Sequence, residues 1–332
     1  MEAKELLERY ATGQTQFEGA NLSGIDLQDE DLIGIILNQC DLHGANFGFA
    51  YLNRSQFVSA NLAGCDLRGA NLSQANLEGA NLRNANLHGA VLQGANLCGA
   101  DLSLATLIDT NLIGADLRKI KLNGANLRGA SLRGANLRME RKSGQANLQG
   151  ARLTRVDLEE VNLRGANLSQ VDFSGSNLKQ VTLSQSDLRG ANLSKAILKD
   201  AVLIEADLTG ATLTGADLTA AKLSGAILVE ADLSQAILRR AIFSQSKMGR
   251  ASLVGVNLNA AVLNQADLSR ANLQGADLSD AELVEAYLAR ANLSTANFTG
   301  ANLLRAEISS ADLLGAIFDG ATMPDGKIFS RE

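Results

Sequence analysis

The chain is poor in large aromatic side chains. Its 332 residues include no Trp, and aromatic residues make up 4%, although hydrophobic residues reach 46%. A conventional globular core uses large aromatics to fill irregular space. The composition therefore argues against such a core and predicts a uniform interior of small and medium aliphatic side chains.

Long hydrophobic runs are absent as well. No stretch of about 18 apolar residues could cross a membrane, and the acidic start MEAKELLERY lacks the apolar stretch of a secretory signal. Three widely spaced cysteines are too few for a disulfide framework. We therefore expect a cytoplasmic protein without a membrane partner. The net charge of −6 indicates solubility and identifies no particular partner.

A five-residue period occupies almost the whole chain. A large apolar residue, usually Leu, recurs every five residues from Phe17 to Leu137 and again from Leu148 to Met323. Of these 61 central positions, 51 hold Leu, and Ala stands two residues earlier in 44. Such a period fits neither a continuous helix nor a straight strand, because the central residues would then not share one face. It fits short extended pieces separated by turns, with Leu and Ala pointing inward.

The repeated sequence resembles a known family. Runs such as Ala70-Asn71-Leu72-Ser73-Gln74 are similar to the A(N/D)LXX motif of pentapeptide-repeat proteins. The resemblance implies an all-β fold, a right-handed quadrilateral β-helix with four repeats in each coil. At about 4.8 Å between stacked strands, roughly 15 coils would extend over about 70 Å.

The two ends and one interruption define the expected organisation. We expect a capping helix within 1–14, a β-helix over 15–325 and a tail or cap at 326–332. The ends resemble cyanobacterial members of the family, including a regulator of heterocyst differentiation. The period slips by one residue between Leu137 and Leu148, which predicts a bulged corner or loop at 138–146. Glu30 occupies an inward position, where local distortion is expected to let its carboxylate reach water.

The residues offer no evident catalytic centre. His43 and His88 are expected on different sides about two coils apart, too far to share a metal. Cys40 and Cys65 replace inward Ala and are expected in the core, whereas Cys98 faces outward without an evident base to activate it. Phosphate-loop and nucleophile-elbow motifs are absent. We therefore predict a non-enzymatic protein with no cofactor and no metal.

Charged and apolar side chains gather at defined outward positions. One basic belt, which carries ten cations against the single acid Glu140, comprises Arg118, Lys119, Lys121, Arg128, Arg133, Arg138, Arg141, Lys142, Arg152 and Arg155. An arginine column on three successive coils comprises Arg250, Arg270 and Arg290, and a neighbouring acid such as Asp267, or a partner, is expected to offset it. An apolar side comprises Val202, Ile204, Ile242, Val262, Val284 and Leu304. Solvation or strand preference alone would also account for each of these sets.

Two functions compete at this point. One is a regulatory scaffold that binds another protein, one with an acidic surface, through the belt or the column. The alternative, implied by quinolone-protecting members of the family, is DNA mimicry at a type II topoisomerase such as gyrase. Mimicry needs a continuous acidic surface, and 30 basic residues interrupt it here. A filled interior disfavours small-molecule ligands, and the scarcity of aromatics disfavours nucleic acid. The scaffold is the preferred hypothesis.

Overall fold

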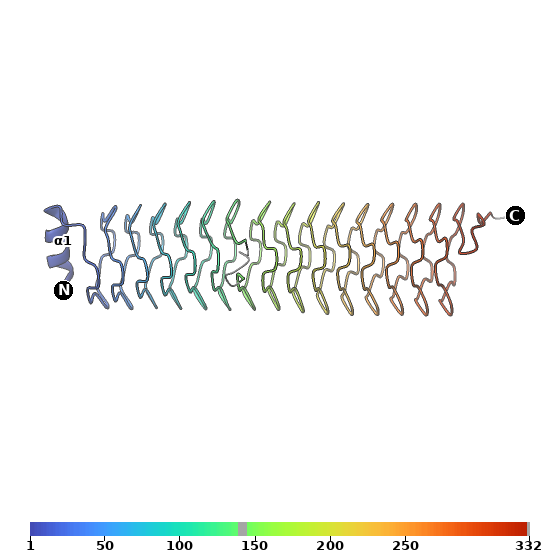
Figure 1. Cartoon of the computed structure of the whole chain (residues 1–332), viewed down its shortest axis with the longest axis horizontal. Coiled ribbons are helices and arrows are strands. Elements are labelled where there is room, and N and C mark those ends of the chain that lie inside the picture. Colours follow the sequence, from blue (N-terminus) through green and yellow to red (C-terminus); the bar gives the residue numbers. More distant parts are fainter. Residues whose placement is uncertain (139–144, 331–332) are drawn as a thin grey trace. The chain divides into compact units, whose positions relative to one another are not determined.

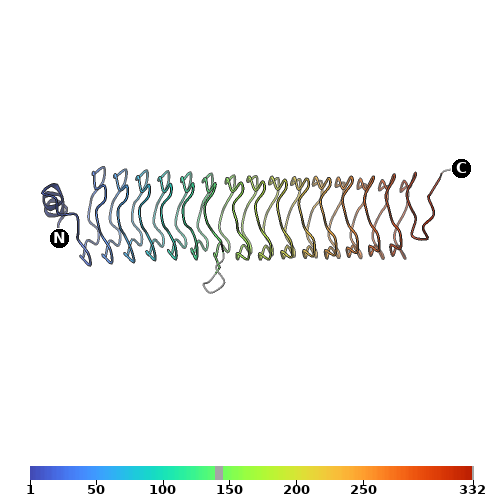
Figure 2. The same ribbon diagram turned by 45° about the horizontal axis from the view of Figure 1, so that its top comes forward.

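The computed structural model describes residues 1–138 and 145–330. The chain forms two compact units, Met1–Asn167 and Leu168–Glu332. Each unit is a right-handed β-helix of four-sided coils, as the sequence predicts (Figures 1 and 2). Along the regular part of the chain, the residue before a centre forms a single parallel bridge to the residue 20 positions later, as in Asn61↔Asn81 and Asp207↔Ile227. Over the described residues, these one-residue bridges take the place of longer strands.

A β-turn follows the central residues of the regular repeats. The amide of Ala75 donates to the carbonyl of Leu72 at 3.0 Å, and the residue between them in the corner, Gln74, has a φ of +59°. A left-handed corner is easiest for Gly, and polar residues such as Gln74 hold many of the other corners. This explains why Gly recurs two residues after the centre. We call this position the corner position.

The side chain of the Asn or Asp before each centre forms two kinds of hydrogen bond. Its side-chain oxygen accepts the amide two residues later, as when Asn81 accepts the Arg83 amide at 3.3 Å. Its amide, where present, donates to the same position on the previous coil, as from Asn81 to Asn61 at 2.9 Å. These bonds satisfy turn donors and align neighbouring coils.

The interior consists of the central residues and the residues two positions before them. Leu82 and Ala80 are both fully buried, and nearly all their equivalents are buried too. Cys40 and Cys65 are buried as expected, and the Cys65 thiol donates to the Leu42 carbonyl at 2.9 Å. Burial raises the pKa of the Cys65 thiol to about 12. Glu30 is only half-buried, which is consistent with the expected access of its carboxylate to water.

The interruption near the middle of the sequence displaces more residues than its one-residue slip in period indicates. Lys121 pairs with Asn147 and Asn136 with Asn162, so the spacing rises to 26 residues (147 − 121) instead of 20. A whole repeat and one further residue therefore fall outside the regular ladder. Residues 139–144, which include most of the predicted bulge, lie outside the described part of the chain.

Helix α1 (Ala3–Ala11) lies against the first coil of its unit. Leu6 is fully buried, and the Tyr10 hydroxyl donates to the Ile33 carbonyl at 2.8 Å. The Arg9 guanidinium lies 5.8 Å from the Phe17 ring centroid. The helix therefore covers apolar side chains that the end of a β-helix would otherwise expose.

The last described residues fold back on the second unit. Gly326 closes a turn by donating to the Met323 carbonyl at 2.9 Å. Ile328 then pairs antiparallel with Thr322, and the Phe329 ring lies 6.0 Å from that of Phe318. This hairpin covers one part of the final coil.

Two inward serines differ in whether their buried hydroxyl groups form a hydrogen bond. The Ser186 hydroxyl donates to the Leu183 carbonyl at 2.7 Å, whereas the Ser246 hydroxyl is buried without a partner among the described residues. We expect Ser246→Ala to raise the free energy of unfolding by about 1 kcal/mol, because an unsatisfied buried hydroxyl is removed. Urea denaturation followed by circular dichroism measures the change. Ser186→Ala is the matched control, and a gain as large there would contradict the explanation.

Candidate partner-binding site

The arginine column stands at one corner of the second unit. Arg250, Arg270 and Arg290 occupy equivalent corner positions on successive coils, with φ values of +59°, +60° and +59°. The amide of Arg250 donates to the Ser269 carbonyl at 3.0 Å, and that of Arg270 to the Ala289 carbonyl at 3.0 Å. The ladder bonds thus hold the three side chains on adjacent coils.

Small residues lie beside this column. The residue before each arginine has a small side chain or none: Gly249, Ser269 and Ala289. The surface between the arginine column and the next row of side chains is therefore recessed. That next row is Lys247, Asp267 and Tyr287, which pair with one another along the ladder. We call this strip the furrow: its floor is Gly249, Ser269 and Ala289, and its rims are the arginine column and the Lys247, Asp267 and Tyr287 row.

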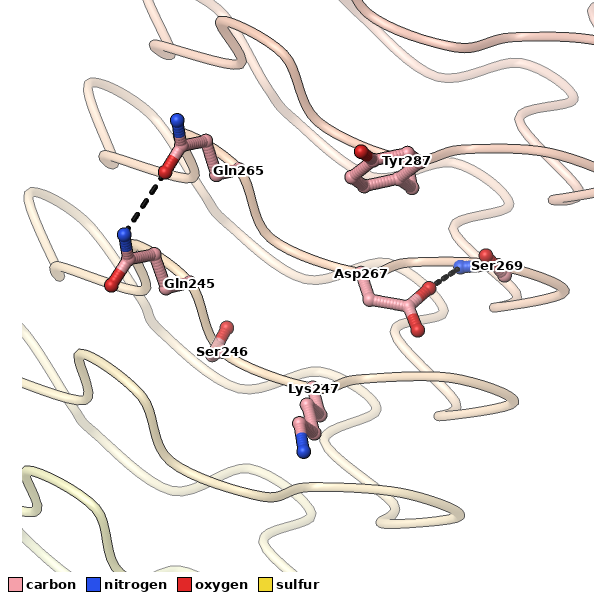
Figure 3. A pocket seen from close by; sticks show the side chains of 7 residues that line it. All are labelled: Gln245, Ser246, Lys247, Gln265, Asp267, Ser269 and Tyr287. Carbon is pink, nitrogen blue, oxygen red and sulfur yellow. Dashed lines mark hydrogen bonds between the residues drawn. The ribbon is translucent and has the colours of Figure 1, made fainter.

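Two open hollows meet in the furrow, and Ser269 lines both. The larger measures about 360 Å³ and extends from Ser269 past Asp267 and Tyr287 to Gln245 and Gln265. Figure 3 shows the Lys247, Asp267 and Tyr287 row on successive coils beside this hollow. The smaller, about 270 Å³, lies between Val229, Gly249 and the side chains of Arg250 and Arg270. Their shape suits an extended chain lying on the surface better than an enclosed small molecule.

The charges of the column are only partly compensated. Arg250 forms an ion pair with Glu230, at 3.3 Å between Nη1 and Oε1. Within the part of the chain that the structure describes, Arg270 and Arg290 form no ion pair. The neighbouring acid that offsets Arg250 is Glu230 of the preceding coil and not Asp267, whose carboxylate accepts the Ser269 amide at 2.9 Å. Two cations therefore remain available along this rim.

The corner behind Tyr287 is a hydrogen-bonded ladder. Gln245 donates to Gln265 at 3.0 Å (Figure 3), and Gln265 donates to Glu285 at 2.9 Å. Glu285 also pairs with Arg305 at 3.4 Å. The hydrogen bond from Gln265 and then the interactions with Arg305 lower the pKa of the Glu285 carboxyl. This ladder supports the far edge of the larger hollow.

The basic belt is divided by the fold. Its described members stand beside four different ladders of the first unit, namely Asp116↔Asn136, Lys121↔Asn147, Asn126↔Arg152 and Ser131↔Asp157. Arg118, Lys119 and Arg138 share one side, Arg128, Arg152 and Arg155 another, and Lys121 and Arg133 lie on the two remaining sides. Arg141 and Lys142 lie outside the described residues. One flat partner surface therefore cannot contact all of the described cations.

Several belt cations already have carboxylate partners. Arg118 pairs with Asp116 at 2.6 Å, Lys121 with Asp101 at 3.8 Å and Arg133 with Asp157 at 3.9 Å. Desolvation opposes ionisation of Asp116, but its hydrogen bonds from Arg118 hold the pKa of its carboxyl below the usual value. These aspartates lie outside the 118–155 segment, so its charge count omits them.

The apolar side is also less continuous than its sequence pattern indicates. Val202, Ile242 and Val262 share one ladder, but Lys222 and Glu282 interrupt it. Ile204 is 37% exposed, and the other members of the set are half-buried. These apolar residues are therefore exposed to solvent as separate small areas and do not form one continuous patch.

The remaining reactive side chains do not converge. The exposed His43 and His88 each place Nδ1 near a carbonyl of the next coil, at 2.8 Å from Ala63 and 3.1 Å from Ile108. Cys98 is half-buried, and desolvation followed by the charge of Asp116 raises the pKa of its thiol. Among the described residues, no three His, Cys, Asp or Glu side chains form a group that could hold a metal, and no helix is long and apolar enough to span a membrane.

Tyr287 is the furrow residue that the sequence analysis missed. Its side chain is 54% exposed, although its position before a centre normally holds Asn or Asp. In the sequence, this departure from the repeat is the signal that could identify Tyr287. Its proximity to the arginine column appears only when residues of adjacent coils are aligned.

Comparisons with known proteins agree with this architecture. A family model described as pentapeptide repeats matches residues 15–138 and 145–323. An uncharacterized protein of Synechocystis sp. is 60% identical over 37 residues, which span 11% of this chain and 11% of that protein.

Two solved structures are also similar. HetL, a pentapeptide repeat protein involved in heterocyst differentiation regulation from Nostoc sp. strain PCC 7120, is 29% identical, with 99% of this chain and 100% of that chain covered and a TM-score of 0.22. QnrB1, a plasmid-mediated fluoroquinolone resistance protein, is 21% identical over 63% of this chain and 92% of its own, with a TM-score of 0.30. With repeats matched over nearly its whole length, the chain belongs to the pentapeptide repeat family.

Proposed function

We propose that this protein is a non-enzymatic scaffold whose furrow binds an extended acidic segment of another protein. The observation that carries the proposal is the pair of aligned arginines, Arg270 and Arg290, without ion pairs among the described residues. The low floor beside them gives a backbone room to lie along the coils. Tyr287 on the opposite rim adds an exposed ring, a side chain enriched at protein interfaces.

The basic belt is a weaker candidate for the same partner. Its described cations point to four sides, and Arg118, Lys121 and Arg133 are engaged with aspartates. In the furrow, by contrast, the free cations and the small floor residues lie on one strip. DNA mimicry also fits this strip less well, because a mimic of a polyanion would present carboxylates where the column presents guanidinium groups.

Charge reversal in the column tests this function. We expect Arg270→Glu/Arg290→Glu to weaken binding of a fluorescein-labelled octapeptide of alternating Glu and Thr by about tenfold, because two attractive contacts become repulsive. Fluorescence anisotropy measures the affinity. The difference should shrink as salt rises from 50 to 500 mM, since exposed charges are screened.

A matched control separates the furrow from overall charge. Arg239 and Arg240 are also exposed in the second unit but stand beside a different ladder, Ile237↔Asn257. Arg239→Glu/Arg240→Glu makes the same change in net charge and should alter the affinity less than about twofold. Equal losses in the two double variants would refute a specific role of the furrow.

A further inference from the structure

An exposed aromatic residue occupies a corner position in the first unit. Phe49 is left-handed, with a φ of +58°, and 57% of its surface is exposed. Among the described left-handed residues, only Phe49 and Leu104 carry a large apolar side chain. A bulky residue is unfavourable in this conformation, and an apolar one is unfavourable in water. The fold itself gains little from Phe49, since Gly or a polar residue serves at most of the other described corners.

The Phe49 ring lies against the next coil. Its Cδ1 and Cε1 atoms are the nearest atoms to the place where a Cβ on Gly69 would stand. The Phe49 amide donates to the Arg68 carbonyl at 2.8 Å, which fixes the backbone on this coil. Gly69 thus provides the space in which the ring lies along the surface, with its outer part open to a partner.

Two further exposed side chains lie on the side of the coils that follows this corner. Tyr51, two residues after Phe49, is 53% exposed, and Ile33 is 47% exposed. Asp31 pairs with Tyr51 in the ladder, so Ile33 and Tyr51 belong to the same side of adjacent coils. Tyr10 of α1 bonds the Ile33 carbonyl and holds this segment in place.

The charges around Phe49 are of both signs, but the cation is engaged. Arg68, whose carbonyl accepts the Phe49 amide, forms an ion pair with Asp66 at 2.5 Å. Asp29 occupies the corner position one coil before Phe49, with a φ of +60°, and Asp31 lies beside Tyr51. Neither carboxylate forms an ion pair within residues 1–138 and 145–330. Two exposed rings and two uncompensated carboxylates therefore meet at one edge, which we call the acidic corner: Asp29, Asp31, Ile33, Phe49 and Tyr51.

We propose that the acidic corner binds a Lys- or Arg-rich segment of a protein partner. An aromatic face attracts a cation through its quadrupole, and a nearby carboxylate supplies the counter-charge. The same arrangement disfavours an acidic partner or a nucleic acid, since Asp29 and Asp31 would repel both. This site would take ligands of the opposite charge to those of the furrow, so its test does not depend on the furrow.

The test removes the rings and keeps every charge. Phe49→Asn/Tyr51→Asn places at both positions a residue that the repeat readily accepts, so the fold should persist. We expect this variant to bind a fluorescein-labelled octapeptide of alternating Arg and Ser about tenfold more weakly than the unaltered protein, as measured by fluorescence anisotropy. Phe49→Trp should retain binding, and its emission should change on addition of the peptide, because the chain has no other Trp.

Leu104→Asn is the control, because Leu104 is also left-handed and 57% exposed but lies at another corner. It should bind the peptide as the unaltered protein does. Unchanged binding by Phe49→Asn/Tyr51→Asn, or an equal loss in Leu104→Asn, would overturn the proposal. A shift from dimer to monomer in sedimentation velocity, seen only in the double variant, would also overturn it, because the rings would then contact a second copy.

Discussion

Replacing Leu102 by Ala should lower the free energy of unfolding by about 3 kcal/mol. Leu102 is fully buried, and its amide is fixed to the Lys121 carbonyl at 2.8 Å, so the backbone cannot move inward to fill the space. The loss combines the burial of the Leu side chain with the cavity left behind. Urea denaturation monitored by circular dichroism gives the change.

The same substitution two residues later is the control. Leu104 is 57% exposed in the corner that follows, so Leu104→Ala should change the stability by less than about 0.5 kcal/mol. A similar loss in the two variants would contradict the assignment of central residues to the interior. It would also undermine the distinction between inward and outward positions on which both proposed binding sites depend.

Introducing a carboxylate on the buried face of α1 should lower the stability by at least as much. Leu6 is fully buried between α1 and the first coil, so Leu6→Asp either buries an unpaired charge or releases the helix. We expect a loss of about 4 kcal/mol in the stability of the first unit. Release of α1 would expose the apolar side chains and strand edges of the first coil. Self-association should therefore accompany the loss of stability. Thermal denaturation and sedimentation velocity measure the two effects.

Leu7→Asp serves as the comparison, because Leu7 is only half-buried in the same helix. It should produce a smaller loss and leave the association state of the protein unchanged. A Leu6→Asp variant that melts and sediments like the unaltered protein would show that α1 does not protect this end.

The interior could be predicted because the five-residue period admits few structures. Inward Leu and Ala follow from the failure of a continuous helix and a straight strand to keep such residues on one face. The repeat also predicts which positions are exceptional. Cys40 and Cys65, for example, are expected in the core because they substitute for Ala, and both are buried.

The candidate sites were less predictable, because side chains that meet on the surface are 20 residues apart in sequence. The pairing of Arg250 with Glu230 and of Lys121 with Asp101 appears only when the coils are in register. The 26-residue spacing at Lys121 and Asn147 changes that register, and a one-residue slip in period does not reveal it. A charge count along the sequence therefore produced a belt that the fold distributes over four sides.

Departures from the repeat were more informative than charge counts. Phe49 and Tyr287 stand where the repeat prefers Gly or a polar residue, and both are exposed by more than half. Neither residue gives the fold an evident advantage, so each needs another explanation. We propose contact with a partner for both residues. In each case the neighbouring charges indicate the chemistry of that partner.

The most direct test of the scaffold account locates the acidic octapeptide on the protein. A photoreactive group at the centre of the Glu-Thr peptide, activated at saturating concentration, should form its main cross-links within residues 247–250, 267–270 and 287–290. Peptide mapping by mass spectrometry would identify them, and Arg270→Glu/Arg290→Glu should abolish them. Cross-links distributed evenly over the four sides of the second unit, or unaffected by the double substitution, would contradict the account.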